Sequence, residues 1–149
     1  MRILIDTNVI LDVILQREPF YDDSKQILIA CQQELLQGTI TTQSIADIYY
    51  ILRKDFSSTE RRRILLGLCE IFHVSTIDRE MLVAALKNES FDDLEDCLQA
   101  ESAALFGAEY VLTRNVKHFT TSPVPAITPK AFCEHMKSLT QPSKANSPI

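Results

Sequence analysis

The chain has 149 residues, a hydrophobic content of 46% and a formal net charge of −5, which together predict one domain with a packed core. The acidic total argues against a protein that holds nucleic acid by bulk electrostatics, but it is compatible with an enzyme that binds a metal ion first. Because no segment approaches the length of a membrane span and no basic leader precedes the first strand, we expect a cytoplasmic protein without a membrane partner.

Strands and helices alternate along the predicted structure. Aliphatic and β-branched runs predict strands, and apolar residues three and four apart predict helices. In chain order these are a strand over 3–5, helices over 9–15 and 21–37, a strand over 39–42, helices over 43–54 and about 59–72, a strand over 73–77, helices over 79–87 and about 92–106, a strand over 110–112, a short strand over 125–128 and a helix over 129–139. This alternation predicts an α/β fold whose parallel sheet is covered on both sides.

Glycine, proline and cysteine support these boundaries. Gly38 and Gly107 are placed to end the helices before them, and Pro129 suits the first turn of the last helix. From residue 140 the chain is polar, so we expect a disordered tail over 140–149 after a domain over 1–139. The cysteines all lie in predicted helices without a CxxC pair, which favours reduced thiols over disulfides or a zinc site.

Asp6 is the first candidate site residue. It follows the aliphatic run Ile3–Ile5 and therefore lies at the carboxyl end of a buried strand, where open α/β sheets bind their ligands. Aspartate is also common as a turn or helix-capping residue. Taken alone, Asp6 is open to both interpretations.

Further polar residues recur at the ends of predicted strands or in the helices that follow them. Gathered at one edge of a parallel sheet, their carboxylates would repel one another unless a cation neutralised them. A hard divalent ion such as Mg²⁺ or Mn²⁺ takes oxygen ligands and keeps waters that can attack a phosphate. We therefore predict an acidic metal site, and its candidate residues are Asp6, Asp47, Asp93, Asp96 and Asn115.

The acidic cluster before the long helix also has a structural interpretation, because carboxylates in a first helical turn complement the helix dipole. We assign that interpretation to Asp92 and Glu95, and a functional one to Asp96, which lies beside the apolar stripe. Asp47 lies inside a predicted helix, where aspartate is unfavourable, so something other than propensity places it there. Asp12 has two interpretations, a solvated carboxylate or one that supports the site residues from behind, and we favour the solvated one.

Other patterns carry less information. His73, His118 and His135 lack metal-ligand spacing, and the three glycines form neither a GxGxxG motif nor a P-loop, so nucleotide binding by those motifs loses support. The basic runs 53–54 and 61–63 could contact a phosphate backbone, although such runs are more often a solvated helix face.

Three motifs in this order resemble PIN-domain proteins, the fold of many VapC-type toxin ribonucleases. They are Ile5-Asp6-Thr7-Asn8, Asp93-Leu94-Glu95-Asp96-Cys97-Leu98-Gln99, and Leu112-Thr113-Arg114-Asn115 followed by Lys117-His118-Phe119. The resemblance covers Arg2 to about Leu139. It implies a three-layer α/β/α domain with four or five parallel strands and a ribonuclease that uses Mg²⁺ or Mn²⁺ to cleave single-stranded RNA. It further implies a homodimer and, for toxin members, an antitoxin that blocks the acidic site.

Carried over residue by residue, the resemblance makes Asp6 the first family carboxylate and Asp96 the carboxylate of the central helix, with Asp93 part of the motif in one subgroup. Three positions depart from the family: Asp47 replaces a usual Glu, and Asn115 and His118 stand where relatives often have Asp. These departures put a second metal position in doubt.

The mechanistic hypothesis is metal-assisted hydrolysis of an RNA phosphodiester. Asp6 and Asp96, helped by Asp47 and Asp93, hold one or two divalent ions that activate water for in-line attack. Asn115, Thr7 and Asn8 orient ligands or waters.

Two alternatives remain open. A catalytically weak PIN-like module that binds RNA or protein would explain Asn115 and His118. A haloacid-dehalogenase-like phosphatase also begins with an apolar strand ending in Asp, but its pattern has a second Asp where this chain has Asn8.

Overall fold

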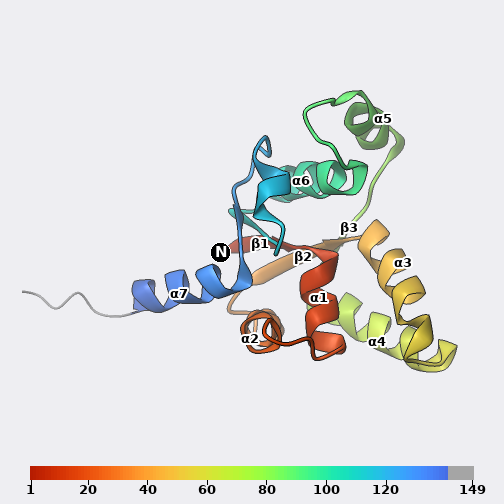
Figure 1. Ribbon diagram of the computed structural model, residues 1–149, viewed down its shortest axis with the longest axis vertical. Coiled ribbons are helices and arrows are strands. Elements are labelled where there is room, and N and C mark those ends of the chain that lie inside the picture. Colours follow the sequence, from red (N-terminus) through yellow and green to blue (C-terminus); the bar gives the residue numbers. More distant parts are fainter. Residues whose placement is uncertain (141–149) are drawn as a thin grey trace, which may run out of the picture.

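The computed structural model describes residues 1–140 (Figure 1). The elements are β1 (Arg2–Ile5), α1 (Thr7–Ile14), α2 (Tyr21–Gln32), β2 (Gln37–Thr41), α3 (Thr42–Ile51), the 3₁₀ turn η1 (Leu52–Lys54), α4 (Ser58–Ile71), β3 (His73–Ser75), α5 (Arg79–Lys87), α6 (Leu94–Phe106), β4 (Tyr110–Leu112), the 3₁₀ turn η2 (Val116–Phe119), β5 (Ala126–Ile127) and α7 (Pro129–Thr140). Of the tail predicted to be disordered, residue 140 is the last of α7 and the rest lies outside the described residues.

All five strands form one parallel sheet in the order β3-β2-β1-β4-β5. The central strand β1 pairs with both neighbours, and Ile3 lies opposite Gly38 of β2 and Tyr110 of β4. Ile3, Leu4 and Ile5 are fully buried, as expected for an aliphatic strand with helices on both faces. The predicted parallel α/β sheet is confirmed.

Helices cover both faces of the sheet, so the predicted three-layer α/β/α architecture is confirmed. Figure 1 shows α1 to α4 on one side and α5 and α6 on the other. Ile3 and Ile5 contribute to the larger core with residues of α1, α2, α3, α4 and α7, whereas Leu4 packs with Ala100 and Ala103 of α6. Alternate side chains of one strand thus bind the two helical layers together.

Helix α2 is shorter than its apolar pattern predicts. It ends at Gln32 rather than Gln37, and Glu34 takes a left-handed backbone conformation with φ 60° before β2 begins. Leu35, which belongs to the apolar pattern of the predicted helix, is 69% exposed. Gly38 is therefore wrong as a helix stop: it lies within β2, where a Cβ atom would stand 2.7 Å from Cδ1 of Phe72.

The other boundaries agree with the sequence to within a few residues. Ser57 and Glu60 form a capping box at the start of α4, and the Asp78 carboxylate caps α5 by accepting from the Met81 amide. Gly107 ends α6 with φ 71°. The cysteines are free thiols. Within residues 1–140, every helix is too short or too polar to cross a bilayer.

Candidate acidic active site

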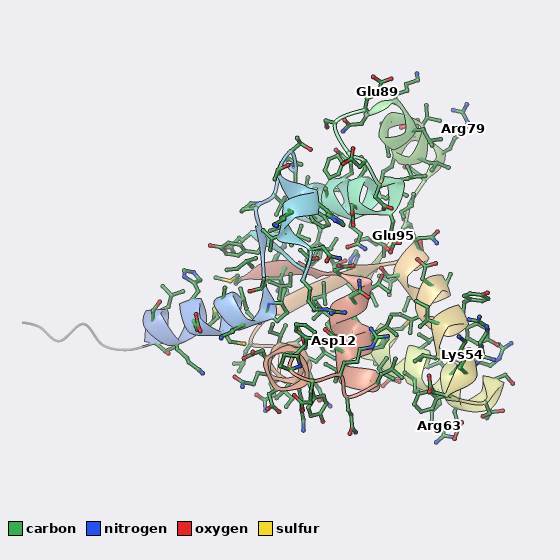
Figure 2. All side chains as sticks on the ribbon, viewed as in Figure 1. Asp12, Lys54, Arg63, Arg79, Glu89 and Glu95 are labelled. Atoms are coloured by element: carbon green, nitrogen blue, oxygen red, sulfur yellow. The ribbon has the colours of Figure 1, made fainter. Side chains whose placement is uncertain are left out.

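A hollow of about 380 Å³ opens beside the carboxyl ends of β1 and β4 and the beginning of α6. All five predicted site residues line it, together with Glu95, which Figure 2 shows between α6 and the beginning of α3. Its lining consists of Asp6, Thr7, Asn8, Asp47, Tyr50, Ile51, Asp93, Glu95, Asp96, Asn115 and His118. Half of the polar residues in this lining therefore carry carboxylates.

The Asp6 carboxylate is held from two sides. Asp6 occupies the N-cap position of α1, but its side chain makes no capping hydrogen bond. Instead, Oδ1 accepts from Nε2 of Gln99 at 3.0 Å, and Oδ2 accepts from Oγ1 of Thr113 at 2.8 Å. The capping interpretation of Asp6 is therefore wrong, and residues of α6 and of the loop after β4 orient this buried carboxylate within the hollow.

The helix-dipole interpretation of Glu95 is incomplete, because its carboxylate also contacts groups within the hollow. Its Oε1 lies 3.3 Å from Oγ1 of Thr7 and 3.4 Å from Nε2 of Gln99, both at hydrogen-bond distance. Burial, reinforced by the Asp47 and Asp6 carboxylates, raises the pKa of Glu95. The available sequence signal was its spacing: Glu95 lies four residues before Gln99 and therefore shares its helix face.

Asp96 lies opposite His118, with Oδ2 of the carboxylate 3.0 Å from Nδ1 of the imidazole. Burial and the nearby Asp93 carboxylate raise the pKa of Asp96, and the bond to His118 opposes that rise. The lack of metal-ligand spacing among the histidines gave no indication of this contact. His118 is thus a neighbour of the predicted carboxylate, contributed by η2.

Two other predicted carboxylates have partners close in the sequence. Asp93 is the N-cap residue of α6, and its Oδ1 accepts from the Asp96 amide at 3.0 Å. A capping role, the structural alternative for this acidic cluster, therefore applies to Asp93. Asp47 is half-buried on α3 and accepts from Nε2 of Gln43 at 2.9 Å.

Asn115 lines the hollow through the loop that follows β4. Its backbone amide donates to Oγ1 of Thr113 at 3.0 Å, and the same Thr113 hydroxyl donates to Asp6. The conformation of this loop is therefore tied directly to the central carboxylate.

The solvated interpretation of Asp12 is wrong. Asp12 is 0% exposed, and Nε of Arg114 lies 3.0 Å from its Oδ2. Burial raises the pKa of Asp12, while Arg114 and Arg17 oppose the rise. The Arg114 guanidinium also lies 4.3 Å from the ring centroid of Phe20. This ion pair lies outside the hollow and ties α1 to the loop that carries Thr113 and Asn115.

The chemistry of the hollow fits a hard divalent cation. All its acidic donors are oxygens, and the raised pKa values of Glu95 and Asp96 reflect in part a carboxylate repulsion that a cation would relieve. Within residues 1–140, however, no three His, Cys, Asp or Glu side chains are already gathered as ligands. The carboxylates bond to protein donors instead, so a cation would have to draw some of them away from those partners.

A sequence model of the PIN domain family matches residues 2–117. Among solved structures, the chain resembles a toxin-antitoxin complex from Klebsiella pneumoniae, with 25% identity, a TM-score of 0.62 and coverage of 85% of this chain and 96% of that one. The chain is also similar to VapBC-1 from nontypeable Haemophilus influenzae, with 17% identity and a TM-score of 0.64. That match covers 87% of this chain and 99% of the other. For VapBC2 from Rickettsia felis, bound to a promoter DNA fragment, the identity is 16% and the TM-score 0.60. That match covers 86% of this chain and 98% of the other. No curated protein sequence matches the chain.

Proposed function

The chain belongs to the PIN domain family, and from this premise we propose that it is a divalent-metal-dependent endoribonuclease that hydrolyses phosphodiester bonds of single-stranded RNA. We further propose that it is the toxin of a toxin-antitoxin pair, because the solved structures it resembles include complexes of that kind.

One observation carries the proposal: a buried, doubly hydrogen-bonded Asp6 faces a hollow lined by further carboxylates. A carboxylate held at both oxygens keeps its orientation when a ligand arrives, because its rotamer is already fixed. The surrounding acidic groups repel a bare phosphate, so this surface is suited to RNA only when cations neutralise it.

Asp6, Glu95 and Asp96 would hold the metal ion, helped by Asp47 and Asp93, which line the same hollow. Mg²⁺ or Mn²⁺ bound there would supply a water of lowered pKa and would offset the charge on the phosphate. Gln99 and Thr113 keep Asp6 turned into the hollow, and Thr7 does the same for Glu95. Asn115 contributes a neutral amide, which can orient a water or a phosphate oxygen without adding negative charge.

Cleavage of labelled single-stranded RNA tests the proposal. The purified chain is assayed with Mn²⁺, with Mn²⁺ and excess EDTA, and as Asp6→Asn, which keeps the shape of the side chain and removes its charge. We expect cleavage only by the unmodified chain with free metal. Cleavage that persists in EDTA or in Asp6→Asn would contradict the proposed site, and a folded chain free of bound inhibitor that cleaves no RNA would contradict the activity.

A catalytically weak RNA- or protein-binding module is the second candidate, because His118 already occupies one oxygen of Asp96. This alternative predicts RNA binding without metal-dependent cleavage. The phosphatase alternative loses its support, since the matching family is the PIN domain. It predicts rapid hydrolysis of p-nitrophenyl phosphate, which can be assayed in parallel.

The proposed assembly is a homodimer in the cytoplasm that an antitoxin inhibits at the acidic hollow. Light scattering of the purified chain tests the dimer. Co-expression with the product of a neighbouring small reading frame tests the antitoxin, which should copurify with the chain and suppress RNA cleavage.

A further inference from the structure

We propose that Tyr50 and Arg53 form a binding site for the nucleotide next to the cleaved bond, with Tyr50 stacking on a base and Arg53 contacting a backbone phosphate. This inference rests on the proposed function, because it assigns a substrate contact to the rim of the same hollow.

The first observation is an exposed aromatic side chain beside an acidic site. Tyr50 lines the hollow, yet 62% of it is exposed. A tyrosine ring left in water at the edge of a polar hollow does not contribute to the core. Aromatic rings in such positions are suited to stacking with unpaired bases, whatever the base sequence.

The second observation is a fixed cation on that ring. The Arg53 guanidinium carbon lies 3.8 Å from the ring centroid of Tyr50, and its NH1 donates to the Tyr50 carbonyl oxygen at 2.9 Å. The ring and the backbone together restrict the side chain, while Arg53 stays exposed. A restricted guanidinium loses less conformational entropy on binding a phosphate than a free lysine would.

A neighbouring pair shows what a structural arrangement of the same residue types looks like. Arg61 of α4 lies over Tyr49, 4.2 Å from its ring centroid, and donates to the Tyr49 carbonyl oxygen. Both of these side chains are half-buried, and the pair ties α4 to α3. The contact between Tyr50 and Arg53 instead joins the end of α3 only to the adjoining turn η1, and both side chains are exposed, so it does not tie distant elements together.

The placement along α3 fits a strand of RNA that leaves the acidic hollow. Asp47 and Tyr50 lie three residues apart on α3, and Arg53 follows at the same interval in the adjoining turn η1, with its guanidinium over the Tyr50 ring. Figure 2 shows Glu95 near the beginning of α3 and Lys54 beyond its other end. Charge therefore changes from negative at Asp47 to positive at Arg53, which matches a substrate with one phosphate at the metal site and another near η1.

The charge of the lining strengthens this assignment. Apart from His118, the residues that line the hollow are acidic or neutral. An RNA strand gains no attraction from carboxylates, so a cation at the rim contributes directly to binding. Arg53 supplies that charge next to the aromatic ring.

Binding is measured by fluorescence anisotropy, with the Asp6→Asn chain as the parent so that the RNA stays intact. The probe is a fluorescein-labelled single-stranded RNA of roughly 12 nucleotides, within the range of known site sizes, in buffer containing Mg²⁺. Tyr50→Ala should weaken binding about 5- to 150-fold, and Tyr50→Phe should bind like the parent. Arg53→Ala should weaken binding and lower the slope of log affinity against log salt by about 1.

Two controls isolate the two contacts. Arg63→Ala removes the same charge from an exposed position on α4 outside the hollow and should leave affinity unchanged. With an oligonucleotide of equal length that lacks bases, Tyr50→Ala should have no effect, whereas Arg53→Ala should still weaken binding. Circular dichroism checks that each variant is folded.

The outcomes separate this inference from the proposed function. If the unmodified chain cleaves RNA and Tyr50→Ala and Arg53→Ala bind the probe like the parent, this site is overturned and the function stands. If the parent binds no RNA and the unmodified chain cleaves none, the function fails, and the site fails with it.

Discussion

Gln99 lies 3.0 Å from Asp6 across the interface between α6 and the end of β1, with its amide nitrogen donating to Oδ1 of the carboxylate. The same nitrogen is within 3.4 Å of Oε1 of Glu95. One buried amide therefore sets the spacing between two carboxylates that come from distant parts of the chain.

Gln99→Leu should keep the fold and lower RNA cleavage by about 10- to 100-fold, because loss of a partner that orients a metal ligand has effects of this size. Steady-state cleavage at several Mn²⁺ concentrations measures the change. Gln99→Glu should be more harmful, since it places a third carboxylate against Asp6 and Glu95. A Gln99→Leu variant with the full rate would show that Thr113 alone orients Asp6.

Glu95→Gln should stabilise the metal-free protein at neutral pH. The pKa of Glu95 is raised on folding, so the folded chain keeps this proton to higher pH than the unfolded chain does. Stability therefore falls as pH rises from the ordinary glutamate pKa through the raised one, and the cost is complete above it.

Urea denaturation in EDTA should show a gain for Glu95→Gln below about 1 kcal/mol at neutral pH, because solvent screens this half-buried group. Below the ordinary glutamate pKa the gain should vanish. An equal gain at every pH would mean that the effect does not come from charge.

Mg²⁺ or Mn²⁺ should raise the melting temperature. An ion present at a hundredfold its Kd stabilises the folded chain by about 2.7 kcal/mol, which corresponds to roughly 5 to 11 °C for a chain of this size. The shift should shrink at acidic pH, because protons compete for Glu95 and Asp96, whose pKa values are raised. Thermal melts with and without EDTA measure it, and Asp6→Asn should reduce it. A shift of full size in that variant would place the ion elsewhere.

Asp12→Ala should destabilise the protein by about 3 kcal/mol. The substitution leaves Arg114 without its buried partner, and the cost is at the low end for such pairs because the Arg114 side chain is still 27% exposed. Guanidinium denaturation measures the loss. Arg17→Ala, which removes the longer 3.7 Å contact to the same carboxylate, should cost less than about 1 kcal/mol. Equal costs would show that Arg114 is not the main partner.

Gly38→Ala and Gly67→Ala should have opposite effects. A Cβ atom at Gly38 would meet the Phe72 ring at 2.7 Å, so overpacking should cost about 1 to 3 kcal/mol. At Gly67, inside α4, nothing lies within 4 Å of the added methyl group, and alanine should stabilise the helix by about 0.5 to 1 kcal/mol. Chemical denaturation measures the free energy of unfolding of both variants. An unchanged value for Gly38→Ala would mean that Phe72 moves aside freely.

The fold could be predicted from local patterns because its central strand is uniformly aliphatic and strands alternate with helices. The end of α2 could not, since the apolar period continues to Leu35 while the chain has already turned at Glu34. The requirement for glycine at residue 38 depends on Phe72, which is distant in the sequence.

The candidate site could be predicted where polar residues follow strands, as at Asp6 and Asn115. Glu95 and Asp12 were misjudged because their environments depend on contacts with distant segments. An acidic residue in a first helical turn looks the same in sequence whether it faces water or, like Glu95, the hydroxyl of Thr7.

The positions of the acidic residues along the chain have a consequence for synthesis of the protein. Asp6 and Asp47 belong to the first half of the chain, whereas Glu95, Asp96 and Asn115 follow α5. A ribosome that has reached the loop between α5 and α6 has therefore made less than half of the acidic lining. The nascent polypeptide therefore cannot assemble this surface until the segment through Asn115 has been made.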